Sequence, residues 1–179
     1  LLSNIQDLLT EQTVNKIAAD YYHVAQWTEK NASGIYDFII MDAPASTSSL
    51  SINAMLAADL IIVPLECETL AIKSLKRFLQ AFKELQRTIE PRLRLAGILL
   101  TMYDDDILSH RQVCKQICKT LGDSVFETIM PNCPHILEAS NLGIDVIQRH
   151  LNSAGATGYI RLANELLDRF LLPKTGELS

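Results

Sequence analysis

The 179-residue sequence lacks any apolar stretch long enough to cross a bilayer, and it lacks a paired CxxC motif. A membrane-spanning helix needs about 20 predominantly apolar residues in a row. Excess positive charge is also missing: the net charge is −5, so no overall attraction to nucleic acid or to an anionic membrane is expected. With 48% hydrophobic and 21% charged residues, the chain has the composition of one globular domain with a sizeable core.

The four cysteines are Cys67, Cys114, Cys118 and Cys133. Cys114 and Cys118 lie four residues apart on a predicted helix, and with Cys133 and His135 they could form a zinc site. Free thiols in a reduced cytosol are the favoured interpretation, because the spacing matches no paired zinc-ligand motif. We therefore predict unpaired thiols and a cytoplasmic protein.

One short apolar run, Phe38 to Met41, predicts a strand buried on both faces. Asp42 follows at its carboxyl end, and Pro44 prevents the strand from simply continuing. Ligands of open α/β sheets bind outside the carboxyl ends of strands, so Asp42 is placed to hold magnesium near a phosphate. The alternative is a buried strand whose terminal acid only caps the following loop.

Short apolar runs and amphipathic helical patterns then alternate along the chain. Further strands are predicted at 60–65, 95–101, 125–130 and, at an edge, 145–147. Helices are predicted at 50–57, 69–88, 109–121, 135–140 and 156–170. This alternation predicts the α/β class, with a mainly parallel sheet flanked by helices.

The domain organisation follows from the same patterns. Residues 1–34 form a separate helical segment, including a helix near 14–29 and a turn at 31–34. Residues 35–172 form the α/β domain, and residues 173–179 form a frayed tail.

Several motifs, taken in order, resemble the ParA/MinD-type (deviant Walker A) ATPases, most closely the ParA (Soj-like) partitioning branch. The segment 36–46, YDFIIMDAPAS, is similar to the family's Walker B and switch II segment. Further similar segments are INA at 52–54, IIVP at 61–64, LLTMYD at 99–104 and the region from Pro131 to Tyr159. Each motif alone is weak, but their order over residues 36–170 makes the resemblance specific.

The resemblance implies a P-loop NTPase of the SIMIBI class that sandwiches ATP and magnesium in a homodimer. Asp42 would match the Walker B acid, which holds magnesium through water. The residues matching switch II would be Ala43, Pro44, Ala45 and Ser46, with Ala45 in place of a usual proline. The adenine side of the site would be formed by Met102, Pro131, Asn132 and Cys133.

The largest departure from the family is the absence of a phosphate-binding loop. No GxxxxGK followed by Ser or Thr occurs in the chain. Asp42 alone cannot retain Mg–ATP, because backbone amides and a lysine normally neutralise the phosphates. We therefore expect an N-terminally incomplete chain that is inactive as given. The alternatives are a catalytically dead adaptor or dimerisation module, and a ParA-like regulator of another process.

The resemblance also implies partners. ATP would drive dimerisation, and a ParB-type protein would stimulate the hydrolysis that dissolves the dimer. Nonspecific DNA binding is the family property with least support, because Asp105 and Asp106 stand where basic residues are common and His135 replaces an arginine. A membrane role is not expected, since the last predicted helix has no basic amphipathic extension.

Overall fold

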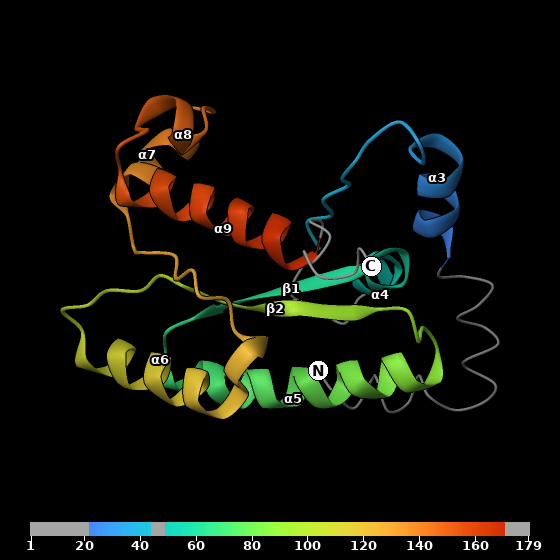
Figure 1. Ribbon diagram of the computed structural model, residues 1–179, viewed down its shortest axis with the longest axis horizontal. Helices are drawn as coiled ribbons and strands as arrows, with labels where there is room; N and C mark the ends of the chain where they lie inside the picture. Colours follow the sequence, from blue (N-terminus) through green and yellow to red (C-terminus); the bar gives the residue numbers. More distant parts are fainter. Residues whose placement is uncertain (1–21, 44–48, 171–179) are drawn as a thin grey trace, which may run out of the picture. The chain divides into compact units, whose positions relative to one another are not determined.

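The computed structural model describes residues 22–43 and 49–170. The N-terminal half contains α3 (His23–Asn31), α4 (Ser49–Ala57), β1 (Leu60–Glu66) and α5 (Thr69–Thr88). The C-terminal half contains β2 (Arg94–Thr101), α6 (Leu108–Leu121), the short 3-10 helix η1 (Gly122–Ser124), α7 (Pro134–Asn141), α8 (Val146–Arg149) and α9 (Ala154–Phe170) (Figure 1). The predicted α/β class, with parallel strands and helices, is confirmed, and the strands predicted at 60–65 and 95–101 are present.

Strands β1 and β2 form a two-stranded sheet. They run parallel, because Arg94 N–H bonds to the Asp59 carbonyl near one end and Cys67 N–H to the Thr101 carbonyl near the other. On its other side β2 meets the segment 125–131 through two parallel bridges, Ile98 to Val125 and Tyr103 to Pro131. Residues 125–131 therefore run beside β2, but they form only isolated bridges, and the strand predicted at 125–130 is not formed.

The chain divides into two compact units, of which unit 1 comprises the residues up to Ile61 and 74–96. Its buried apolar cluster comes from α4, α5 and the turn before β2, with the members Ile52, Leu56, Phe82, Leu85 and Leu93. The side-chain spacing of α5 explains its place there. Leu75, Phe82 and Leu85 are buried, whereas Lys76 and Lys83 are exposed, as an amphipathic helix requires.

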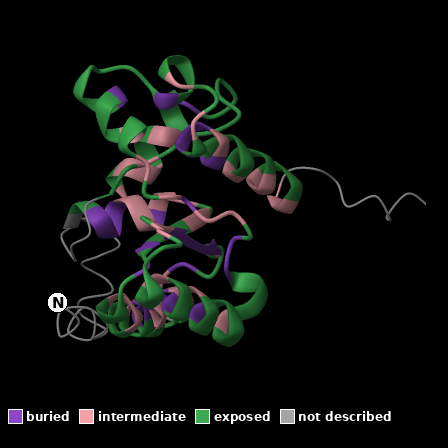
Figure 2. Cartoon of the chain, turned by 90° about the vertical axis from the view of Figure 1, so that its left-hand side faces the viewer, coloured by how far each residue is buried: buried purple, intermediate pink, exposed green. Residues whose placement is uncertain are grey.

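Unit 2 comprises residues 62–73 and 97–179. Ile98 and Leu100 of β2 are fully buried there, and Phe126 is 2% exposed. Gly97 allows Phe126 to pack against β2, because a Cβ at this position would lie 2.8 Å from Phe126 Cε2. Figure 2 shows the helices exposed over much of their surface, with buried residues on the remaining faces and in the strand region.

A second cluster in unit 2 joins α7, α8 and α9, which contact one another. Ala139, Val146 and Ala156 are buried in it, and Ile136 packs against them. Gly155 permits this close packing, because a Cβ there would lie 2.7 Å from Ile136 Cγ1. The cluster fixes the start of α9 against the two shorter helices.

Two further strand predictions are wrong. Residues 38–41 form no strand, and the side chain of Ile40 is 94% exposed. A strand needs hydrogen-bond partners for its backbone groups. In the described ranges, no strand pairs with residues 38–41. Residues 145–147 do not form an edge strand either. Asp145 caps α8 by accepting a hydrogen bond from Gln148 N–H at 2.8 Å, which favours a helix start.

Other predictions lie partly or wholly outside the described residues. These are the helical patterns before residue 22, the switch II positions Pro44, Ala45 and Ser46, and the tail at 173–179. A turn is present at 32–35, close to its predicted position. Among the helices in the described ranges, none combines the length and the apolar character needed to span a bilayer.

Candidate nucleotide-binding site

The carboxyl end of β2 lies beside the end of the segment 125–131, within unit 2. Tyr103 N–H donates to the Met130 carbonyl at 3.1 Å, and Asn132 N–H donates to the Tyr103 carbonyl at 2.8 Å. These two bonds continue the parallel pairing beyond β2. They bring the predicted adenine-side residues Met102, Pro131 and Asn132 to one edge of the sheet, where α/β proteins bind ligands.

Met102 has an unusual backbone conformation at this edge. Its φ is 54°, in the left-handed region, which a non-glycine residue with a long side chain seldom adopts. The side chain is 48% exposed. Such conformations collect at ligand-binding positions, where the surrounding structure maintains them. Here the pairing of Tyr103 with residues 130–132 holds the chain immediately after Met102.

Cys133 follows Asn132 and is the N-cap residue of α7. Its side chain is half-buried, and the sulfur faces Gly155, where a Cβ would lie 3.3 Å from Sγ. Asn132 is exposed, and Pro131 is half-buried. Three of the four predicted adenine-side residues, Met102, Pro131 and Asn132, are therefore at least partly exposed at this edge of the sheet. The fourth, Cys133, packs toward Gly155 of α9.

The acidic loop after Tyr103 is held by its own hydrogen bonds. The Tyr103 hydroxyl donates to Asp105 Oδ1 at 2.8 Å, and this bond raises the pKa of Tyr103 to about 12. Asp106 N–H donates to Asp104 Oδ1 at 3.0 Å, and Arg111 donates to the Asp105 carbonyl at 2.6 Å. The loop is therefore a fixed, negatively charged rim beside the sheet edge.

Asp42, the predicted magnesium-binding acid, belongs to unit 1. Asp42 and Ala43 are both exposed. They belong to the irregular segment that follows α3, which Figure 1 shows as a ribbon without regular structure. Because residues 38–41 form no strand, Asp42 does not stand at the carboxyl end of a strand. Asp42 thus belongs to unit 1, whereas Met102, Pro131, Asn132 and Cys133 belong to unit 2.

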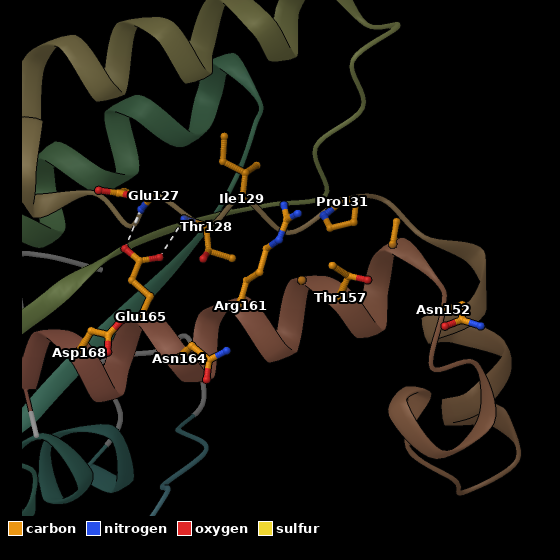
Figure 3. A pocket seen from close by; sticks show the side chains of 12 residues that line it. Glu127, Thr128, Ile129, Pro131, Asn152, Thr157, Arg161, Asn164, Glu165 and Asp168 are labelled. Atoms are coloured by element: carbon orange, nitrogen blue, oxygen red, sulfur yellow. Dashed lines mark hydrogen bonds between the residues drawn. The ribbon is translucent and has the colours of Figure 1, made fainter. Parts of the chain in front are cut away.

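Two side chains of α9 attach this helix to the segment 123–128, a feature that sequence reasoning missed. The Glu165 carboxylate accepts hydrogen bonds from Glu127 N–H at 2.7 Å and Thr128 N–H at 2.9 Å (Figure 3). Burial alone would raise the pKa of Glu165, but these bonds and nearby Arg169 lower it overall. Arg169 bonds to the carbonyls of Asp123 and Val125, and its guanidinium lies 4.9 Å from the centre of the Phe126 ring.

An open pocket of about 960 Å³ lies beside these contacts, between the segment 127–131 and α9. Pro131 is the predicted site residue that lines it, together with Thr157, Arg161 and Asn164 of α9 (Figure 3). The sequence presents these α9 side chains only as the polar face of an amphipathic helix. The signal that could have identified them is the run of polar residues at helical spacing from Thr157 to Asp168.

The phosphate-binding half of a nucleotide site has no counterpart in the sequence. No GxxxxGK followed by Ser or Thr is present, so the amides and lysine that hold phosphates are lacking in these 179 residues. Met102, Pro131 and Asn132, at the carboxyl edge of β2, can contact a nucleotide base, since they combine apolar surface with a side-chain amide. The residues of the chain do not fit a complete Mg–ATP site.

The cysteines do not form the zinc site considered from the sequence. All four are free. Cys114, Cys118 and Cys133 do not come together with His135 as ligands among the described residues. Burial raises the pKa of Cys67 and of Cys114, each to about 11, so both thiols hold their protons at neutral pH.

Parallel strands joined through helices, with ligand-type residues at the carboxyl edge, define an α/β domain of the P-loop NTPase class. Comparison with known proteins narrows this class. A family model described as "AAA domain" matches residues 2–95, more than half of the chain. The chain belongs to the ParA/MinD-type P-loop ATPase family.

Curated relatives include the chromosome partitioning protein ParA of Caulobacter vibrioides, 35% identical over 138 residues, or 77% of this chain and 52% of the relative. The chromosome-partitioning ATPase Soj of Thermus thermophilus is 39% identical over 134 residues, or 75% of this chain and 54% of the relative. The chain thus spans about half the length of the curated relatives it matches.

Solved structures show the same fold. Cobyrinic acid a,c-diamide synthase from Mycobacterium smegmatis, with a bound ATP analogue and magnesium, superposes with a TM-score of 0.71 at 28% identity. That match covers 90% of this chain and 59% of the synthase. The septum site-determining protein MinD from Pyrococcus horikoshii, complexed with Mg-ADP, has a TM-score of 0.64 at 24% identity and covers 84% of this chain and 58% of MinD.

Proposed function

We propose that this chain supplies part of the nucleotide site of a ParA-like ATPase in chromosome or plasmid partitioning. ATP binding would close a homodimer, and hydrolysis stimulated by a ParB-type partner would open it again. The ParA and Soj relatives support this function, since they are named for chromosome partitioning. It would act in the cytoplasm.

The observation that carries the proposal is the edge formed by Met102, Pro131 and Asn132. Apolar surface from Met102 and Pro131 suits the face of an adenine ring, and the Asn132 amide offers a donor and an acceptor for its edge. Cys133 would hold the loop at residues 131–133 in place by packing near Gly155 of α9. These residues would bind and orient the base, and they take no part in bond breaking.

Asp42 would supply the carboxylate for magnesium, a cation that prefers oxygen ligands and keeps several waters. Ala43 to Ser46 would form the loop that responds to the terminal phosphate. When bound, magnesium neutralises phosphate charge during phosphoryl transfer. Without a phosphate-binding loop in the chain, Asp42 lacks the amide and lysine partners that this chemistry requires.

The first test concerns the gene. An in-frame KGGxGK followed by Ser or Thr, encoded upstream of the Leu1 codon, would support the ATPase. A start codon directly upstream with no such motif would contradict it and favour an adaptor or dimerisation module that retains the family fold.

The second test concerns the protein. We expect the 179-residue chain alone to show no ATP turnover above background, measured by phosphate release. Turnover that disappears in an Asp42→Ala variant would contradict this expectation. For the base-binding edge, Asn132→Ala in the product of the intact gene should weaken binding of a fluorescent ADP. Asn141→Ala, an exposed change at the end of α7, should leave it unchanged.

DNA binding is a further part of the proposal that can be measured separately. The fixed acidic rim at Asp104–Asp106 repels phosphate, and nonspecific DNA binding depends on cationic contacts with phosphates. We expect weak retardation of duplex DNA at low salt. Retardation that persists at physiological salt would contradict the inference from these three acids.

A further inference from the structure

Three metal-ligand side chains meet where α7, α8 and α9 pack together. His135 and Glu138 lie on α7, and His150 directly follows α8. One ligand atom from each side chain lies within 4.8 Å of the others. The residues come from two separate elements, so the tertiary packing of unit 2 brings them together.

The distances match the requirements of a coordinated ion. Glu138 Oε2 lies 3.1 Å from His150 Nε2 and 3.6 Å from His135 Nδ1. In a tetrahedral zinc site with metal–ligand bonds of about 2.0–2.1 Å, neighbouring ligand atoms are about 3.3–3.4 Å apart. The two observed distances lie on either side of this value, and all three ligand atoms lie within 4.8 Å of one another.

The backbone holds these ligands in place. His135 and Glu138 are three residues apart on α7, a spacing that puts both on one helix face. His150 is fixed by its own N–H, which donates to the Val146 carbonyl at 2.8 Å, and by its carbonyl, which accepts from Ser153 N–H at 2.9 Å. The two imidazole rings lie 4.3 Å apart, centre to centre.

The donor set also fits. Two imidazoles and one carboxylate form a common three-ligand set for zinc, which leaves a fourth position open for water or for a donor from another molecule. The side chains of His135, Glu138 and His150 are 50%, 45% and 26% exposed, so an ion can enter from solvent. We propose that these residues bind a first-row divalent cation, with zinc as the best match.

The competing interpretation is a plain surface cluster in which Glu138 pairs with His135, His150 and Arg149 and binds no ion. Arg149 lies 3.4 Å from Glu138, but it contacts Oε1, the oxygen opposite to the one that faces the imidazoles. The guanidinium therefore contacts one oxygen, while Oε2 is the oxygen that faces both histidines. Its positive charge nevertheless opposes an incoming cation, so Arg149 should lower the affinity of the site.

The test uses the full chain, kept reduced, and titrates it with cobalt(II) and then zinc. We expect a visible spectrum of tetrahedral cobalt with one ion per chain, without the intense near-ultraviolet band of sulfur ligation. Zinc should displace the cobalt. His135→Asn, Glu138→Gln and His150→Asn should each weaken zinc binding at least about tenfold, since even outer-shell changes often cost that much.

Two variants serve as comparisons. His23→Asn removes an exposed histidine on α3, in unit 1, and should leave zinc affinity unchanged. Arg149→Gln should raise the affinity, because it removes the competing charge next to Glu138. Zinc should also raise the midpoint of thermal unfolding in the unaltered chain and in His23→Asn, but not in His150→Asn.

The outcomes separate the alternatives. Zinc affinity that is unchanged in both His135→Asn and His150→Asn overturns the proposal. A sulfur-to-cobalt band also overturns it, because the ion would then sit on cysteine. Circular dichroism of each variant shows whether it is folded, and the raised affinity of Arg149→Gln gives a readout that loss of folding cannot imitate.

Discussion

Two apolar runs in this chain resemble each other in composition but differ in structure. Residues 38–41 read Phe-Ile-Ile-Met and residues 98–100 read Ile-Leu-Leu. Ile98 and Leu100 are fully buried in β2, whereas Ile40 is 94% exposed on an irregular segment. Apolar composition is therefore the same signal in both places, and it does not decide which run becomes a strand.

The difference lies in the neighbours. β2 pairs with β1 on one side and with the segment 125–131 on the other, so its amides and carbonyls find partners while its side chains are buried. The run at 38–41 has no such ladder among the described residues. A buried strand needs its backbone groups paired, and burial without pairing costs more than exposure.

The largest expected effect comes from shortening one side chain in each run. Leu100→Ala should lower the free energy of unfolding by about 2–5 kcal/mol, because it leaves a cavity at a fully buried position. Ile40→Ala should change it by less than about 0.5 kcal/mol, because the side chain is already in solvent. Urea denaturation followed by circular dichroism measures both.

This pair of variants tests the comparison directly. An Ile40→Ala cost similar to that of Leu100→Ala would mean that the run at 38–41 is buried in solution, as the sequence predicted. The conclusion drawn from the two runs would then be wrong.

The next effect concerns the contact between β2 and the segment 125–131. Gly97→Ala should cost about 1–3 kcal/mol, because its new Cβ would lie 2.8 Å from Cε2 of the buried Phe126 ring. Phe126→Leu removes that ring atom. In a double-mutant cycle measured by urea denaturation, Gly97→Ala should therefore cost less in the Phe126→Leu background. Equal costs in the two backgrounds would exclude the ring as the cause.

Sequence patterns alone predicted much of the fold. The bounds of α5 and β2 agree with the apolar spacing to within one residue, since both elements bury a continuous face. The strand prediction for residues 38–41 was wrong because strand formation depends on neighbouring strands that pair with the backbone, and a local sequence pattern does not contain them. The strand prediction for residues 145–147 was wrong because the Asp145 side chain caps a helix start, and this outweighed the strand preference of its β-branched neighbours.

The candidate site was predictable only in part. Met102, Pro131 and Asn132 followed from a family resemblance, and the structure places them at one edge. The role of Glu165 was not predictable, because its hydrogen-bond donors, Glu127 and Thr128, lie far away in the sequence. His150 was likewise missed as a neighbour of Glu138, because only the packing of α7 and α8 brings them together.

A smaller loss in the free energy of unfolding is expected when Glu165 is replaced. Glu165→Gln should cost about 1 kcal/mol at neutral pH, because an amide replaces a carboxylate that accepts two backbone hydrogen bonds. The folded state lowers the pKa of Glu165 from an ordinary value of 4.5. Its contribution to stability is therefore present above that value and is lost as the pH falls through the lowered pKa.

The measurement is urea denaturation of both proteins from neutral pH down into the acid range. The difference between them should be constant above the ordinary pKa and should shrink below it. Glu127→Gln is the matched control, because the backbone N–H of Glu127, and not its side chain, makes the bond. A difference that stays constant to the lowest pH would show that the charge of Glu165 is irrelevant.

The smallest effect is expected at Met102. Met102→Gly relieves a left-handed backbone with φ of 54° but adds freedom to the unfolded chain, so the free energy of unfolding should change by less than about 1 kcal/mol. Met102→Ala retains the backbone cost and should be the less stable of the two variants. A reversed order in thermal denaturation would show that the side chain of Met102 makes stabilising contacts.

The proline inside β1 has a consequence for self-association. The Asp59 carbonyl and the Cys67 N–H both point toward β2. Because the direction of the backbone groups alternates from one residue to the next along a strand, the backbone nitrogen of Pro64 points toward the edge of β1 that lies away from β2. In the described residues β1 pairs with β2 alone, so no described strand pairs with β1 along that opposite edge. Pro64 removes one donor from its centre and thereby discourages uncontrolled strand addition, the first step of aggregation.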